Sequence, residues 1–365
     1  MKSIVEDTLA REASVVAKVE DTRVDHELEE LLAKMRTNIK IIGVGGAGSN
    51  TIARITEEGV VGAELIAANT DAQHLYTVRV PKKILLGRRT TKGLGAGALP
   101  QIGEEAAKEA EDELKAALQG ADMVFVTCGL GGGTGTGSSG YISKMARDLG
   151  ALTIGVVTLP FKGEGRLRME SAEWGLDRLR NSADTVVTIP NDRLLDLVPR
   201  MPLNAAFRFA DEVLMRSIKG LTEVITKPGL VNLDFNDIKT IMKGAGVAMI
   251  GLGESEAMGE ERALEAIDEA INSPLLEVDI SQANGVLVNV IGGNDMTVSE
   301  AERVAEVVQT KVSTNARIIW GATVDPTLEH KLRVMLVATG VKSKQITGRR
   351  DLPPTSLRMG VDVVR

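Results

Sequence analysis

The chain has 365 residues, of which 43% are hydrophobic and 25% are charged, which predicts an ordinary globular protein with room for two domains and a sizeable core. The formal net charge of −7 and the aromatic content of 2% argue against nucleic acid as the main partner, because such proteins need a basic surface and stacking side chains. The single cysteine excludes an internal disulfide, the three histidines are scattered, and no apolar run is long enough to span a bilayer. We therefore expect a cytoplasmic protein without a His/Cys metal site and without direct membrane insertion.

The chain begins with a charged segment, residues 1–37, that contains no glycine. Residues 24–35 place Leu28, Leu31, Leu32 and Met35 at helical spacing, so we predict a helical extension here.

Apolar strands and helices then alternate from residue 38 to residue 201, which we expect to form one domain. A long helix is predicted over 104–118. Six strands separated by helices predict a doubly wound parallel sheet in an α/β fold. The six strands are predicted at 39–42, 64–68, 83–87, 122–128, 152–159 and 184–189.

A first glycine loop, 43–48, follows the first strand with the pattern G-x-G-x-x-G, and a helix is predicted from Ser49 or Asn50. By itself this loop favours a dinucleotide site in which Asp71, after the second strand, holds a ribose. An NAD-dependent oxidoreductase is therefore one hypothesis.

The most distinctive stretch is the loop 129–137, Gly-Leu-Gly-Gly-Gly-Thr-Gly-Thr-Gly, between the strand that ends at Cys128 and a helix over 138–148. Its backbone N–H groups and the hydroxyls of Thr134 and Thr136 suit an anion, but it has no lysine and so is not a P-loop. A third glycine-rich loop spans 91–97. Because such loops lie at the carboxyl ends of parallel strands, they can converge on one ligand. Three loops favour a nucleoside triphosphate over a dinucleotide.

The remainder predicts a long central helix over 202–227, a smaller α/β domain over 228–341 and a tail over 342–365. In the smaller domain, helices at 260–272 and 298–312 separate strands at 247–253, 285–291 and 316–321, and a last strand follows at 332–339.

Two side chains of the central helix, Phe207 and Asp211, are four residues apart and so lie on one face. The ring can stack on a purine, and the carboxylate can accept hydrogen bonds from the ring N–H and amino group of guanine, which adenine does not offer. Alternatively, Phe207 is a core residue and Asp211 a solvated charge.

Two acids, Asp234 and Asp237, lie three residues apart at a predicted helix start. The residues alone favour an N-cap and a first-turn acid.

The run from Gly131 to Gly137 resembles the signature loop of the tubulin and FtsZ superfamily, and the resemblance to the FtsZ family of tubulin-like cell-division GTPases extends from residue 39 to about 339. It implies a GTP-binding domain joined by the central helix to the smaller domain. The residues that it implies for GTP and GDP are Gly45, Gly46, Ala47, Gly48, Ser49, Asn50, Asn69, Asp71, Ala96, Gly97, Gly131, Gly132, Gly133, Thr134, Gly135, Thr136, Glu164, Arg168, Asn191, Phe207 and Asp211.

The resemblance also reverses the reading of the two acids. It implies that Asp234 and Asp237, with Asn232 nearby, complete the active site of the neighbouring subunit, with Mg²⁺ on the phosphates. It further implies head-to-tail homopolymers, a division ring at mid-cell and membrane-tethering division proteins as partners. The alternatives are the oxidoreductase, a tubulin-like cytoskeletal paralogue outside division, and a GTP-dependent scaffold that does not hydrolyse.

Overall fold

The computed structural model describes residues 37–341, except 198–201, 228, 232, 258, 260, 277 and 278. The predicted helix over 24–35 and the tail 342–365 lie outside the described residues. The strands are β1 (Ile39–Val44), β2 (Ala63–Asn69), β3 (Lys82–Leu85), β4 (Met123–Gly129), β5 (Leu152–Leu159), β6 (Thr185–Pro190), β7 (Gly246–Ser255), β8 (Gly285–Gly292), β9 (Arg317–Val324) and β10 (Leu332–Thr339).

These strands form one sheet with the order β3-β2-β1-β4-β5-β6-β7-β10-β8-β9. Strands β1 to β6 are parallel, which confirms the predicted doubly wound sheet. The sheet continues into the smaller α/β half because β6 and β7 pair in parallel, with Thr185 opposite Gly246. Only β10 runs antiparallel to both of its neighbours.

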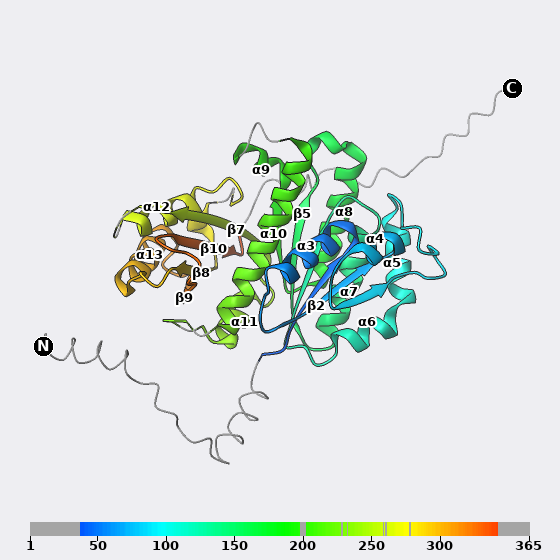
Figure 1. The fold of residues 1–365 in the computed structure, drawn as a ribbon, viewed down its shortest axis with the longest axis horizontal. Helices are drawn as coiled ribbons and strands as arrows, with labels where there is room; N and C mark the ends of the chain where they lie inside the picture. Colours follow the sequence, from blue (N-terminus) through cyan, green and yellow to red (C-terminus); the bar gives the residue numbers. More distant parts are fainter. Residues whose placement is uncertain are drawn as a thin grey trace, which may run out of the picture. The chain divides into compact units, whose positions relative to one another are not determined.

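Helices cover both faces of the sheet (Figure 1). They are α3 (Gly45–Glu57), α4 (Ala72–Thr77), α5 (Pro100–Glu109), α6 (Glu111–Leu118), α7 (Thr134–Asp148), α8 (Arg166–Ser182), α9 (Asn191–Leu197), α10 (Leu203–Thr226), α11 (Phe235–Met242), α12 (Glu261–Ile271) and α13 (Val298–Lys311), with short 3₁₀ turns η1 (Lys162–Glu164) and η2 (Ile280–Gln282). Among the described residues, none of these helices is long and apolar enough to cross a bilayer.

The core consists of two hydrophobic clusters, one on each face of the sheet. Alternate residues of β1 show the division: Ile39 and Ile41 belong to the cluster that includes residues of α3, α10 and α11, whereas Ile42 and Val44 belong to the cluster that includes residues of α5, α6, α7, α8, α12 and α13. Both clusters extend into the smaller half, so the two halves share their cores.

The predicted helix over 104–118 is wrong in one respect, because the structure has two helices, α5 and α6, that meet at Ala110 (φ −93°, ψ 18°). Both helices contact α7 and contribute to the same hydrophobic cluster. Gly103 of α5 lies against the backbone of Gly133, where a side chain would not fit, and Leu114 of α6 is buried in the core.

The predicted central helix is α10, whose 24 residues correspond to about 36 Å. Its inner face buries Val213, Leu214, Ile218 and Leu221. In Figure 1 this helix lies between the two halves, with α9 near its first residue and α11 near its last. The helix therefore separates two ends of the molecule by a fixed distance.

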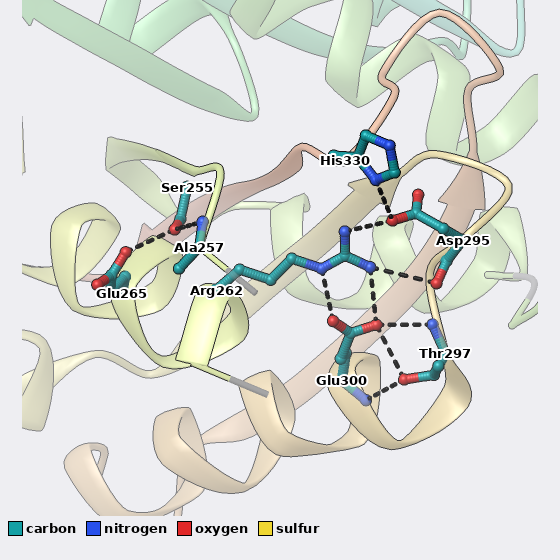
Figure 2. A network of polar contacts seen from close by, with 8 residues as sticks. All are labelled: Ser255, Ala257, Arg262, Glu265, Asp295, Thr297, Glu300 and His330. Carbon is teal, nitrogen blue, oxygen red and sulfur yellow. Dashed lines mark hydrogen bonds and ion pairs between the residues drawn. The ribbon is translucent and has the colours of Figure 1, made fainter. Parts of the chain in front are cut away.

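A buried ion pair holds the helices of the smaller half together (Figure 2). The Arg262 guanidinium of α12 donates to Glu300 of α13 at 2.5 and 3.1 Å and to the Asp295 carboxylate at 2.6 Å. Glu300 also accepts from the backbone and hydroxyl of Thr297, which caps α13. Burial by itself would raise the pKa of Glu300, but the hydrogen bonds from Arg262 and Thr297 hold that pKa below its ordinary value. Each charge thus has hydrogen-bonding partners.

We expect Arg262→Ala to destabilise the protein by about 3–5 kcal/mol, because it leaves the Glu300 carboxylate buried without its partner. The measurement is urea unfolding. Arg303→Ala is the matched control, because Arg303 pairs with Glu306 on the exposed side of α13, the helix that carries Glu300. This substitution should lower the free energy of unfolding by less than about 1 kcal/mol. Equal losses in the two variants would show that the buried pair has no special role in stability.

Candidate functional site

Two helices begin at the carboxyl ends of neighbouring central strands. Helix α3 starts at Gly45, directly after β1, and α7 starts at Thr134, shortly after β4. Both begin earlier than predicted, so part of each glycine loop is the first turn of a helix. Since β1 and β4 are adjacent although β2 and β3 lie between them in the chain, this is the switch point where doubly wound sheets bind ligands.

The two helix starts are suited to an anion. The N–H groups of a first helical turn have no partner within the helix, and neither Val44 nor Gly133 supplies a side-chain cap. Neither first turn contains an acid that would compensate the positive end of the helix dipole. Gly45 has φ +75°, and a Cβ on it would lie 3.0 Å from the Gly135 nitrogen. Glycine therefore permits both the backbone conformation and the close approach of α3 to α7.

The third glycine loop and the turn after β2 are hydrogen-bonded to each other and to the start of α7. The Gly133 N–H donates to the Gly97 carbonyl at 3.0 Å, and the Gly95 N–H donates to the Thr70 carbonyl at 3.1 Å. The Thr70 and Thr134 hydroxyls lie 2.6 Å apart. The structure thus brings together the predicted residues of four segments, namely 45–50, 69–71, 96–97 and 131–136, as expected from their places at the carboxyl ends of strands.

Asp71 has a structural partner in this network. Its carboxylate accepts the backbone N–H of His74 at 2.9 Å and so caps α4. A dinucleotide site would need this carboxylate for a ribose and would need only one glycine loop. The geometry therefore does not favour the oxidoreductase hypothesis, although the strand order β3-β2-β1-β4-β5-β6 is the one that dinucleotide folds use.

Several of the other predicted site residues belong to the start of α10, to α9 and to the loop after β5. Phe207 at the start of α10 is 38% exposed, so it is not a core residue, and its ring meets Phe161 edge to face with centroids 5.2 Å apart. The Lys162 N–H donates to Asp192, which ties the loop after β5 to α9, the helix that Asn191 begins. The Asn191 side-chain oxygen is buried and has no hydrogen-bond partner among the described residues.

Asp211 is not a solvated charge either. Its side chain is 16% exposed and lies 3.7 Å from the Arg54 guanidinium of α3. Burial raises the pKa of Asp211 to about 6, and the charge of Arg54 opposes that rise. A partly desolvated carboxylate of this kind gains from a ligand that offers N–H donors.

Glu164 and Arg168 form an ion pair with each other at the start of α8. The Glu164 carboxylate also accepts the Phe161 N–H at 2.9 Å. The backbone of Arg168 lies against Gly131, where a Cβ would be 3.0 Å from the Arg168 carbonyl oxygen. Both residues therefore border the loops, but their side chains are engaged with protein partners.

The predicted catalytic acids lie elsewhere. Asp234 caps α11 by accepting the Asn236 N–H at 2.9 Å, and Asp237 is in the first turn, with both acids exposed. Asn232 lies outside the described residues. Helix α11 lies near the end of α10 that is opposite to Phe207 and Asp211, and the last residue of α10, Thr226, is about 29 Å along the helix from Phe207 and about 23 Å from Asp211. The acids and the glycine loops of one chain cannot meet on one ligand.

Sequence reasoning missed three residues of the site: Thr70, His74 and Arg54. Thr70 stands between two selected residues and could have been found from its place at the end of β2. His74 bonds to the side chains of Asn50 and Asn69, and Arg54 pairs with Asp211. These pairings join residues of separate elements, so no local sequence pattern predicts them.

The chain matches two family models. The Tubulin/FtsZ family GTPase domain matches residues 38–199, and the FtsZ family C-terminal domain matches residues 246–342. Cell division protein FtsZ 1 of Archaeoglobus fulgidus is 56% identical over 369 residues and is covered in full, as is this chain. Cell division protein FtsZ 1 of Pyrococcus horikoshii is 52% identical, over 98% of this chain and 96% of that protein.

Solved structures of FtsZ and of a related protein are also similar to this chain. An empty FtsZ dimer from M. jannaschii superposes with a TM-score of 0.84 at 53% identity, over 87% of this chain and 92% of that chain. The GTPγS-bound CetZ2 protofilament from Haloferax volcanii has a TM-score of 0.75 at 22% identity, over 85% of this chain and 96% of that chain, which shows a shared fold.

We expect Gly45→Ala to weaken the binding of a nucleoside triphosphate at least tenfold, because a left-handed alanine costs about 1–2 kcal/mol and its Cβ presses on Gly135. The measurement is equilibrium binding of a fluorescent triphosphate. Gly120→Ala is the matched control, since Gly120 has nearly the same φ (+74°) and open space around it but precedes β4, at the amino ends of the strands. Equal affinity in the two variants would refute a phosphate site at the start of α3.

Proposed function

The chain belongs to the Tubulin/FtsZ family of GTPases, and we propose that it polymerises head to tail, that each subunit completes the GTPase site of the next, and that the filaments form the cell-division ring. The observation that carries the proposal is the separation of the glycine loops from Asp234 and Asp237 by the length of α10. A subunit with a nucleotide face at one end and acids at the other is complete only when two copies stack.

We infer that the starts of α3 and α7 hold the phosphate chain with their unpaired N–H groups, and that Asp71, Ala96 and Gly97 border its terminal part. Backbone N–H groups, which glycine allows to approach closely, and helix dipoles stabilise the negative charge on phosphate oxygens. In the FtsZ family signature, Gly131 to Thr136 belong to the same cradle. Glu164, Arg168 and Asn191 would border the ribose.

We propose that Mg²⁺ binds together with the phosphates of GTP. No group of three or more His, Cys, Asp or Glu side chains that could hold a metal occurs among the described residues. A Mg²⁺ ion bound mainly by phosphate oxygens and water needs no such cage, and it would neutralise phosphate charge. The protein's own part is to position the phosphates.

Hydrolysis requires a group that orients water and accepts its proton. In the proposed filament Asp234 and Asp237 of one subunit supply this group to the nucleotide of the next, with Asn232 beside them. Both carboxylates are exposed on the free subunit and thus accessible to a neighbour.

Exposed apolar side chains near both ends support contact between copies. Tyr76 is 86% exposed, Leu94 is 85% exposed and Leu167 is 75% exposed, and all three belong to segments that border the glycine loops. Leu230, which is 52% exposed, precedes Asp234. Burying such side chains favours association. A head-to-tail contact of this kind is heterologous and produces an open filament.

The cellular part of the proposal rests on the relatives named above, two of which carry the name cell division protein. We propose a cytoplasmic location at the mid-cell ring, with membrane-tethering division proteins as partners. The division into a GTP-binding domain over 38–201, a connecting helix over 202–227 and a smaller domain over 228–341 is part of the same proposal.

Asp237→Ala should lower GTP turnover by at least about a hundredfold while GTP binding and filament formation persist, because it removes an acid that acts on the neighbour's nucleotide. Phosphate release and light scattering are recorded together. Glu261→Ala, which removes an exposed carboxylate from the first turn of α12, is the matched control and should leave turnover unchanged. Normal turnover in the Asp237 variant would contradict catalysis in trans.

GTP affinity should fall about tenfold per pH unit once the pH drops below about 6, because guanine needs the ionised form of Asp211 and its pKa in the free protein is about 6. Above that pKa the carboxylate is charged and affinity is full. Asp211→Asn does not titrate at this position, so its affinity should change less with pH and should report the titration of the nucleotide alone. If the GTP affinities of the two proteins changed with pH in the same way, Asp211 would not be the group that recognises guanine.

A further inference from the structure

The imidazole of His74 lies between two amide side chains that come from different elements. Its Nε2 is 3.0 Å from the Asn50 side-chain oxygen in α3, and its Nδ1 is 3.2 Å from the Asn69 side-chain nitrogen at the end of β2. The backbone of His74 is fixed as well, because its N–H donates to Asp71 at 2.9 Å. The ring thus bridges the second turn of α3 and the turn that follows β2.

The hydrogen bonds determine how each group is oriented. The Asn69 oxygen accepts the Asp71 N–H at 3.3 Å, so the Asn69 amino group faces the ring and Nδ1 is the acceptor. The ring proton is therefore on Nε2, which donates to the Asn50 oxygen. Asn50 is exposed, and the contact of its oxygen with His74 leaves its amino group available as a donor to a ligand. Asn50 is in the second turn of α3, one turn beyond the N–H groups that have no partner within the helix.

We propose that His74 is a positioning residue for the phosphate chain of GTP: it orients the Asn50 amide as a phosphate donor and couples the start of α3 to the Thr70–Asp71 turn. The inference rests on the proposed nucleotide site. A neutral imidazole suits the task because it has one donor and one acceptor on opposite sides of a rigid ring. Thr70 continues the connection, since its hydroxyl lies 2.6 Å from that of Thr134 at the start of α7. The coupling therefore reaches both helix starts that face the phosphates.

The test measures binding of GTP and GDP to the full-length chain, held below the concentration at which it assembles. His74→Leu keeps a similar volume but removes both hydrogen bonds, and it should weaken GTP binding about tenfold, with a smaller loss for GDP. His74→Gln should recover most of the affinity, because its amide again offers one acceptor and one donor. His330→Ala is the control, since His330 is an exposed histidine of the smaller half, and it should bind as the wild type does.

The outcomes separate this inference from the proposed function. If the wild-type chain does not bind GTP, the proposed function is wrong. If the wild type binds GTP and the leucine variant binds it equally well, the positioning role is wrong while the proposed function stands. If the leucine and glutamine variants lose affinity equally, the hydrogen bonds of the ring are not the cause, and the inference is overturned. Thermal unfolding of each variant shows whether a loss reflects a damaged fold.

Discussion

The close approach of two helix starts is the constraint on which the rest of the site depends. Because β1 and β4 are parallel neighbours, α3 and α7 leave the sheet side by side, and only small residues at Gly45 and Gly135 allow their backbones to come so close. Two sets of unpaired N–H groups then face one space, and the loops at 69–71 and 95–97 are hydrogen-bonded to its edge. The proposed phosphate site is thus a consequence of strand order and of missing side chains rather than of one charged residue.

Helix α10 sets the distance between this site and the acids of α11. The same helix carries Phe207 and Asp211 near its beginning and leads to the acids of α11 beyond its end. Since the sheet and both hydrophobic clusters continue through the two halves, the two ends are parts of one packed structure. A bound nucleotide is therefore kept from the acids of its own subunit, which makes assembly the natural switch for hydrolysis in the proposed function.

The fold was largely predictable because its signals are local. Six buried apolar strands, the glycine loops that follow them and the long amphipathic stretch of α10 all have characteristic patterns, and the structure has each of them. The break at Ala110 was not predictable, since residues 104–118 contain neither proline nor glycine. The pairing of β6 with β7 has no local signal either. In the site, glycine spacing identified the loops, but the contacts of Asp211 with Arg54 and of His74 with two asparagines exist only once distant elements pack together.

The central claim is that one subunit holds only half of a catalytic centre. The most direct test is the rate of phosphate release per subunit, measured over a wide range of protein concentration with GTP and Mg²⁺ in excess. The account predicts almost no release at high dilution and a steep rise above the concentration at which filaments appear by light scattering. A rate per subunit that is high and independent of dilution would contradict it, because an isolated chain would then possess a complete active site.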